Sequence, residues 1–156
     1  MAAGKKSAGL LLYREVDGAL EVFLVHPGGP FWARKDDGAW SIPKGEIEGD
    51  EDPLAAALRE TAEETGFRIE GEGALALQPL KQSGGKVVQA WAVVADVDPT
   101  ALVSNDFTTE WPPKSGRVQA FPEVDRGAWF SLEAARGKIL KGQAGFLDQL
   151  EQALAK

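Results

Sequence analysis

The chain has 156 residues, of which 44% are hydrophobic and 26% are charged. This length and composition are typical of one globular domain, so we expect residues 1–156 to form a single unit. The formal net charge of −7 disfavours extended nucleic acid and anionic membranes as partners, and the absence of cysteine excludes disulfides and thiolate chemistry. A small phosphorylated ligand remains compatible with this charge, because bound divalent cations reverse the local potential of an acidic pocket.

From the first residues we expect no secretion signal. Lys5 and Lys6 are not followed by an apolar stretch with a small-residue cleavage site, and no run of about 18 apolar residues occurs in the sequence. We therefore expect a cytoplasmic protein that does not enter a membrane. A monomer or a homodimer is expected.

The N-terminal part begins with two apolar, β-prone runs. Ser7–Arg14 and Ala19–His26 are separated by a segment with an Asp17-Gly18 pair, which is a strong hairpin signal, so two antiparallel strands are predicted. The next segment, Pro27–Gly38, is rich in glycine and charge and is expected to be a loop that borders a site. It leads into the short segment Ala39–Pro43.

The best-defined predicted element is a helix over Pro53–Thr65. Asp52 followed by Pro53 matches an N-cap with proline at the first helical position, and Gly66 matches the residue that ends a helix. Because both ends carry specific signals, we expect the helix to begin at Pro53 and to end at Thr65.

The C-terminal half is less regular. Ala74–Gln82 and Lys86–Val97 flank Ser83-Gly84-Gly85 and predict a second hairpin. Several prolines in Thr100–Pro122 argue against a central strand, so an extended loop is expected there. The end of the chain predicts a short strand over Ala128–Phe130, a helix capped by Ser131 and running to about Leu140, and a final helix over Gln143–Ala155.

The helix over Pro53–Thr65 separates apolar from acidic side chains. At about 100° per residue, one side holds Leu54, Leu58, Thr61, Ala62 and Thr65, and the opposite side holds Glu60, Glu63 and Glu64. The three glutamates repel one another and have no other evident charge partner, although Arg59 can orient one of them. A hard divalent cation offsets this repulsion, whereas the alternative for the three glutamates alone is a solvated helix face.

The glutamates belong to a longer ordered pattern. It comprises Gly45, Glu51, Arg59, Glu60, Glu63, Glu64, Gly66 and Phe67, with five residues between the first two and seven between the second and third. This pattern resembles the Nudix box, G-x5-E-x7-R-E-U-x-E-E-x-G-U, in which U is a bulky aliphatic residue. Thr61 and Phe67 depart from it, both on the packing side. The resemblance extends from the lead-in Trp40–Gly45 to the region Trp129–Glu133.

The resemblance implies a Nudix fold of the α/β (α+β) class, with a mixed central β-sheet sandwiched between helices. It also implies a bound Mg²⁺ ion, with Mn²⁺ as the alternative. The implied metal ligands are Glu60, Glu63, Glu64 and a backbone carbonyl near Lys44 and Gly45, with Glu51 as the remaining box carboxylate.

A further glutamate lies outside the box. Some members of the family use a glutamate six residues before a late tryptophan as a metal ligand or base, and Glu123 stands six residues before Trp129. The metal would neutralise phosphate oxygens and activate a water that attacks a phosphoanhydride bond. Glu63, Glu64 or Glu123 would take the proton from that water, and the sequence leaves this choice open. Arg59 completes the predicted catalytic set.

Substrate contacts are expected from loops beside the box. The candidates are Trp32 and Trp111 for stacking on a base, and Lys44, Arg34, Lys35, Lys114 and Arg117 for contacts with phosphates. Lys44 is the best placed of the cations. Packing and solvation are the alternative roles for these tryptophans and cations. His26, the only histidine, is expected to be structural.

The lead-in Trp40–Gly45 is similar to that of diadenosine polyphosphate hydrolases and of the diphosphoinositol polyphosphate phosphatases. A dinucleoside polyphosphate such as diadenosine tetraphosphate is the first expected substrate. Those hydrolases often carry a tyrosine downstream of the box, whereas the only tyrosine here, Tyr13, lies upstream. The alternative is a housecleaning pyrophosphatase that acts on oxidised nucleoside triphosphates. A Nudix-fold ligand-binding regulator is the alternative from another class, and the intact glutamates disfavour it.

Overall fold

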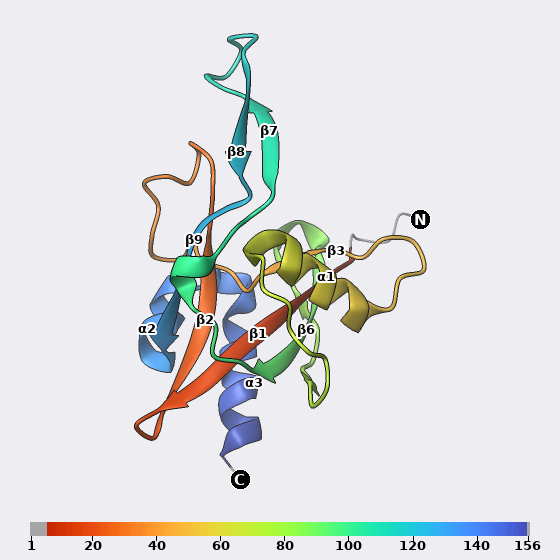
Figure 1. The fold of residues 1–156 in the computed structure, drawn as a ribbon, viewed down its shortest axis with the longest axis vertical. Coiled ribbons are helices and arrows are strands. Elements are labelled where there is room, and N and C mark those ends of the chain that lie inside the picture. Colours follow the sequence, from red (N-terminus) through yellow and green to blue (C-terminus); the bar gives the residue numbers. More distant parts are fainter. Residues whose placement is uncertain (1–5, 156) are drawn as a thin grey trace.

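The computed structural model describes residues 6–155 and contains a seven-stranded mixed sheet between helices (Figure 1). The predicted fold class is therefore confirmed. The strands β4 (Leu75–Ala76), β6 (Val87–Val94), β1 (Lys6–Val16), β2 (Ala19–Pro27) and β9 (Val124–Ser131) lie side by side in this order, while β3 (Lys44–Glu46) pairs with β1 and β5 (Leu80–Lys81) pairs with β6. Strand β6 is parallel to β1, and the other pairings in this sheet are antiparallel.

The central strands bury both of their faces. Leu10 and Leu12 of β1 pack in a cluster with Ala56 and Ala57 of helix α1 (Pro53–Thr65). Leu11 packs in a second cluster on the other face, together with helices α2 (Leu132–Lys138) and α3 (Ala144–Leu154). Because successive side chains of a strand point to opposite faces, the apolar run of β1 supplies both clusters.

The two predicted hairpins are present. Asp17 and Gly18 both have positive φ, as the turn between antiparallel β1 and β2 requires. A short 3₁₀ turn over Ser83–Gly85 leads from β5 into β6, but the predicted strand Ala74–Gln82 is interrupted and forms only the short strands β4 and β5. Among the described residues, no helix is long and apolar enough to cross a membrane.

The expected extended loop over Thr100–Pro122 is wrong. After a 3₁₀ turn over Pro99–Ala101, strands β7 (Asp106–Glu110) and β8 (Val118–Pro122) form a separate two-stranded antiparallel sheet. This hairpin projects from the body of the molecule (Figure 1). The segment does not join the central sheet, and its prolines lie in the turn and at the end of β8, where proline is tolerated in a strand pair.

The predicted C-terminal elements are present with shifted bounds. Strand β9 is longer than the expected Ala128–Phe130, since it pairs with β2 along most of its length. The Ser131 hydroxyl caps α2 by accepting a hydrogen bond from Ala134 N. Helix α3 begins after a 3₁₀ turn over Lys141–Gln143. The N-terminal Lys5 lies outside the described residues.

The buried face of α1 differs from the predicted one. Its buried residues are Ala56, Ala57, Thr61 and Thr65, whereas Leu54, Leu58 and Ala62 are only partly covered. Glu64 follows Thr61 by three positions and Ala57 by seven, so these three side chains share one stripe of the helix. Glu64 therefore lies beside the buried face, not opposite to it.

Candidate functional site

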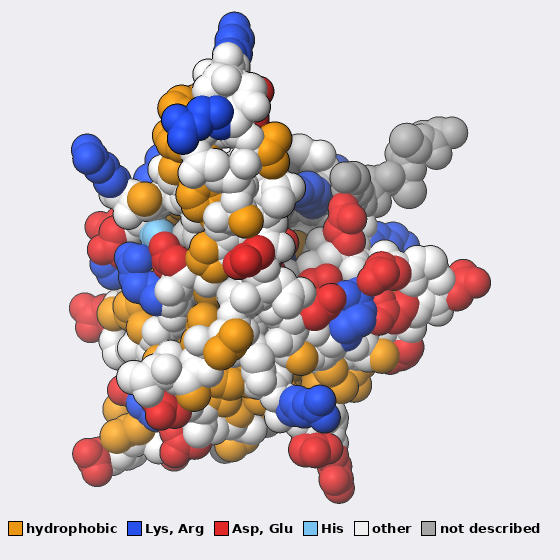
Figure 2. Space-filling model, turned by 45° about the horizontal axis from the view of Figure 1, so that its top comes forward, with side chains coloured by type: hydrophobic (Ala, Val, Ile, Leu, Met, Phe, Trp, Pro, Cys, Tyr) orange, Lys and Arg blue, Asp and Glu red, His pale blue; other side chains and the backbone are white. Residues whose placement is uncertain are grey.

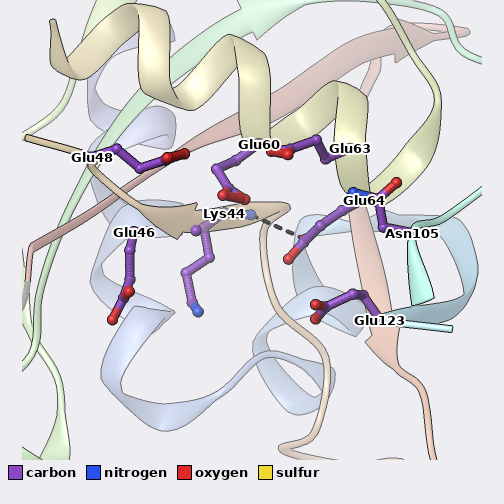
Figure 3. Close-up of a pocket in the computed structure, with 9 residues that line it drawn as sticks. Lys44, Glu46, Glu48, Glu60, Glu63, Glu64, Asn105 and Glu123 are labelled. Carbon is purple, nitrogen blue, oxygen red and sulfur yellow. Dashed lines mark hydrogen bonds between the residues drawn. The ribbon is translucent and has the colours of Figure 1, made fainter. Parts of the chain in front are cut away.

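An acidic cavity of about 400 Å³ opens between α1, β3 and the start of β9. It is lined by Lys44, Gly45, Glu46, Glu48, Glu60, Glu63, Glu64, Asn105 and Glu123. Three glutamates reach it from α1, while Glu123 approaches from the opposite wall (Figure 3). The cavity thus brings together all the predicted metal ligands.

The local sequence of α1 explains how the helix presents its glutamates. The Asp52 side chain accepts a hydrogen bond from Ala55 N at 3.0 Å, and Pro53 follows at the first helical position. At the other end, Gly66 adopts the left-handed conformation with φ 79° and donates its N–H to Ala62 O. The helix ends are therefore as predicted.

Gly45 leaves room for the carboxylate of Glu60. A Cβ atom at position 45 would stand 2.0 Å from the Glu60 carboxyl carbon, which is far inside a normal contact distance. Strand β3 is itself held to β1, where Gly45 faces Ala8 in the antiparallel register. A side chain at position 45 would therefore displace a carboxylate from the acidic cavity.

Glu64 is the most perturbed carboxyl group of the cavity. Burial against the core raises its pKa to about 8, and the nearby charges of Glu60 and Glu123 act in the same direction. The charge of Lys44 opposes this shift, and Lys44 N donates a hydrogen bond to Glu64 Oε1 at 3.2 Å. Burial and then Glu63 raise the pKa of Glu60 as well. Ionisation of these carboxyl groups is therefore unfavourable in this cavity.

Arg59 is a charge partner that the sequence analysis underestimated. Its Nε and Nη2 atoms donate to both oxygens of Glu51 at 2.8 and 2.9 Å, and Nη1 donates to Glu63 at 2.6 Å and Glu60 at 3.1 Å. The expectation that the helix glutamates lack another charge partner is therefore wrong. The bidentate pairing lowers the pKa of Glu51 to about 2.

Glu123 is positioned by backbone hydrogen bonds from two directions. Its N–H donates to Asn105 O at 2.7 Å, and its carbonyl accepts from Gly28 N at 2.9 Å. Asn105 N in turn donates to Glu63 O at 2.9 Å, so one chain of bonds links α1 to the start of β9. No motif signalled Asn105, because it lies in the irregular stretch before β7.

The donor set of the cavity fits a hard divalent cation. Carboxylate oxygens of Glu60, Glu63, Glu64 and Glu123 line it together, and such oxygens are the preferred ligands of Mg²⁺ and Mn²⁺. In residues 6–155, no three acidic or histidine side chains already meet closely enough to enclose an ion. Arg59 holds Glu60 and Glu63 by hydrogen bonds in this arrangement.

A second, more apolar pocket of about 250 Å³ adjoins the acidic cavity. Lys44, Glu64 and Glu123 line both. Its remaining wall consists of Val25, Pro27, Trp32, Ala39, Ser41, Val124 and Leu140. Sequence analysis identified Trp32 and Lys44 but missed the aliphatic members, which look like ordinary core residues along the chain.

Trp32 and Trp111, far apart in the sequence, line one further pocket of about 320 Å³ between the loop after β2 and the β7–β8 hairpin. Lys35 lies near this pocket, with its Nζ 4.1 Å from the ring centre of Phe31 and 5.2 Å from that of Trp32. Arg34 is exposed on the same loop and lines none of the three cavities.

His26 is buried and connects two elements near the site. Its Nε2 lies 2.6 Å from the carbonyl oxygen of Lys35, and its Nδ1 lies 3.0 Å from Asp125 Oδ1. It therefore ties the loop after β2 to β9. This geometry agrees with the structural role expected for His26.

The two box residues that depart from the family pattern both pack inside. Phe67 contacts Phe23 edge to face, with ring centres 5.8 Å apart. Thr61 is fully buried, and its Oγ1 has no hydrogen-bond partner among the described residues. Neither departure changes the acidic wall of the cavity.

The sequence matches a family model and a curated relative. A model of the NUDIX domain matches residues 5–150. The asymmetrical bis(5'-nucleosyl)-tetraphosphatase of Caenorhabditis elegans is 37% identical over 65 residues, a match that spans 42% of this chain and 43% of that protein. The chain therefore aligns with less than half of this curated relative.

Solved structures match over nearly the whole chain. A binary complex of the C. elegans Ap4A hydrolase is 26% identical, with a TM-score of 0.62 and coverage of 97% of this chain and 98% of that chain. The NUDIX domain of Shewanella oneidensis NrtR, crystallised with ADP-ribose, has a TM-score of 0.69 at 19% identity and covers 99% of this chain and 90% of its own. The latter likeness shows the fold alone.

Proposed function

The chain belongs to the NUDIX family, and we propose that it is a divalent-metal-dependent hydrolase of a phosphoanhydride bond in a nucleoside diphosphate derivative. A dinucleoside polyphosphate, such as diadenosine tetraphosphate, is its first expected substrate. One observation carries the proposal: the acidic cavity and the apolar pocket share Lys44, Glu64 and Glu123. A phosphate chain and a base can therefore be bound side by side.

The acidic cavity supplies the residues for the chemistry. Glu60, Glu63, Glu64, Glu123 and the carbonyl of Gly45 would hold the metal, with Mg²⁺ as the expected ion and Mn²⁺ as the alternative. When bound, such an ion neutralises phosphate oxygens and lowers the pKa of a coordinated water.

The protein's own groups would orient the substrate and move the proton. The Lys44 side chain projects beside the cavity and would contact a phosphate (Figure 3). Arg59 would hold Glu63 and Glu60 in place through its hydrogen bonds to both carboxylates. Glu63, Glu64 or Glu123 would accept the proton of the attacking water.

The apolar pocket supports a nucleoside as part of the substrate. Trp32 offers an aromatic face, while Val25, Val124 and Leu140 exclude water. The 26% identity with a C. elegans Ap4A hydrolase over nearly all of both chains favours a dinucleoside polyphosphate among such substrates.

A substrate panel tests this proposal. Purified protein is incubated with Mg²⁺ or Mn²⁺ and a dinucleoside tetraphosphate, oxidised and normal nucleoside triphosphates, a nucleotide sugar or ADP-ribose, and the products are separated by chromatography. We expect the dinucleotide to give the highest kcat/KM and excess chelator to abolish turnover. Full activity in chelator would refute the metal mechanism.

The same panel separates the other functions. Higher kcat/KM for an oxidised triphosphate would assign a housecleaning pyrophosphatase instead. Binding of a nucleotide, measured by calorimetry, without turnover of any substrate in either metal would assign a ligand-binding regulator and overturn the proposal.

A further inference from the structure

The β7–β8 hairpin carries aromatic side chains that no core packing explains. Phe107 faces Phe121 across the two strands, and Trp111 follows at the end of β7. Neither of the two hydrophobic clusters includes a described residue of positions 106–122. Phe107 and Phe121 contact each other with ring centres 6.2 Å apart, and all three rings are half-buried. Because an isolated two-stranded hairpin is marginal, rings on it that stay partly open to solvent indicate a binding role.

The hairpin is held against the loop after β2. Gly28 N donates to the carbonyl of Glu123 at the end of the hairpin, and a Cβ atom at Gly28 would stand 2.0 Å from Pro122 O. Gly29 has φ +94°, and a Cβ atom there would stand 2.8 Å from the Phe107 ring. Two adjacent glycines thus allow the loop to approach the hairpin closely.

The space between loop and hairpin is an aromatic pocket. Its lining comprises Gly28, Gly29, Pro30, Phe31, Trp32, Phe107, Thr109, Glu110, Trp111 and Pro113. Trp111 is held through its backbone, since its N–H donates to Arg117 O at 2.9 Å and its carbonyl accepts from Gln119 Nε2 at 2.6 Å. Phe31, with 63% of its surface exposed, offers a second ring that is open to a ligand.

This aromatic pocket is continuous with the proposed site. Trp32 lines both the aromatic pocket and the apolar pocket, which in turn shares Lys44 with the acidic cavity. The three spaces therefore form a series: acidic cavity, apolar pocket, aromatic pocket. Because the acidic cavity lies at one end of this series, a ligand with one base in each of the other two pockets bends its flexible phosphate chain back from that cavity.

The cationic side chain beside the aromatic pocket favours an anionic ligand with aromatic ends. The Lys35 ammonium lies over the Phe31 and Trp32 rings. Basic and hydrophobic side chains gather on the projecting hairpin, while acidic ones gather beside α1 (Figure 2). Glu110 is the acidic member of the aromatic pocket, and its two oxygens already accept hydrogen bonds from Lys114 N and Gly116 N.

We propose that the aromatic pocket between the loop after β2 and the β7–β8 hairpin binds the second base of a dinucleoside polyphosphate, by stacking between Trp111 and Phe31. This inference rests on the proposed function, because it assigns the other base to the apolar pocket. Stacking on aromatic rings accepts any base, so the hairpin selects for a second nucleoside without selecting its identity.

The test compares two substrates that differ by one nucleoside. A dinucleoside tetraphosphate and a nucleoside 5'-tetraphosphate are hydrolysed by wild type, Trp111→Ala and Phe31→Ala. We expect the ratio of their kcat/KM values, dinucleotide over mononucleotide, to fall about 10-fold in each variant. Val118→Ala, at a 71% exposed position of the same hairpin outside the pocket, is the matched control and should keep the wild-type ratio.

The outcomes separate this inference from the proposed function. An unchanged ratio in both Trp111→Ala and Phe31→Ala overturns the inference, even if they turn over both substrates more slowly. Loss of self-association in these variants with an unchanged ratio assigns the rings to a second copy of the chain, and this also overturns it.

Hydrolysis of neither substrate by wild type instead overturns the dinucleoside polyphosphate as the substrate in the proposed function. Calorimetric titration of the dinucleotide into wild type and Phe31→Ala then decides the inference alone, with about 10-fold weaker binding as the expected result and equal binding as the contrary one. Thermal melting of each variant establishes that it is folded.

Discussion

Helix α1 and the β7–β8 hairpin both line ligand-sized cavities, but the protein supports them differently. Helix α1 is capped at both ends and buries Ala56 and Ala57 in the core. The hairpin contributes no described residue to either core cluster and touches the body through the loop at Gly28 and Gly29. One element is fixed by packing, and the other projects from it (Figure 1).

This difference predicts that the two elements have different roles in catalysis and in substrate binding. Metal ligands and proton acceptors tolerate little displacement, so they are best placed on a rigid, buried element. Stacking on a base tolerates more variation, because every base presents an aromatic face. Substitutions along α1 should therefore act mainly on kcat, and substitutions in the hairpin mainly on discrimination between substrates.

Glu64→Gln should produce the largest effect. The change keeps the size of the side chain but removes a buried carboxylate, so we expect kcat to fall about 10³-fold while KM changes severalfold at most. Steady-state kinetics on the dinucleotide and circular dichroism measure activity and fold. Wild-type turnover in this variant would show that Glu64 has no catalytic role. A change in KM alone would contradict the expectation that substitutions in α1 act mainly on kcat.

Glu123 lies at the junction of the two regions, between the end of β8 and the start of β9. If it acts with the α1 glutamates, Glu123→Gln should lower kcat about 10²-fold and affect KM less. Repeating the kinetics across a Mg²⁺ titration separates its roles. A rate that excess metal restores indicates a ligand, and a rate that stays low indicates the base. Changes of less than about twofold in both parameters would exclude both roles.

The pKa of Glu64 predicts how the metal-free protein responds to pH. Because burial raises this pKa to about 8 from the usual 4.5, the folded state holds the proton more tightly than the unfolded chain. Its contribution to stability is full below about pH 4.5 and is lost as pH rises through about 8.

Chemical denaturation in chelator between pH 5 and pH 9 measures this loss. Between pH 5 and pH 9, the free energy of unfolding of wild type should fall by on the order of a few kcal/mol more than that of Glu64→Gln. Saturating Mg²⁺ should reduce the loss, because the cation stabilises the ionised carboxylate. Parallel pH profiles for the two proteins in chelator would show that Glu64 is not protonated in the folded state.

Thr61→Val should give the smallest effect, on stability alone. It replaces a buried hydroxyl that lacks a partner among the described residues with a methyl group of similar size, so we expect stabilisation by about 1 kcal/mol. Thr65→Val is the contrasting variant, because Thr65 Oγ1 donates to Thr61 O and accepts from Phe67 N. It should destabilise by about 1 kcal/mol. Equal effects in urea denaturation would contradict this interpretation.

Local signals in the sequence determined the elements that present the acidic residues. Asp17-Gly18 predicted a turn, and Asp52-Pro53 with Gly66 predicted both ends of α1, since turns and caps depend on residues a few positions apart. The spacing of Glu60, Glu63 and Glu64 likewise placed them near one another, because helical geometry alone sets their separation.

The tertiary structure decided which long-range neighbours these residues have. Three features depend on segments that are distant along the chain: the burial of Glu64, the position of Trp32 and Trp111 in the wall of one pocket, and the approach of Glu123 across the cavity. The strands of the hairpin were missed because their proline-rich surroundings mask a pairing that does not belong to the central sheet. Propensity and periodicity act within a turn or a strand, whereas packing between elements sets burial, charge environment and the shape of the cavities.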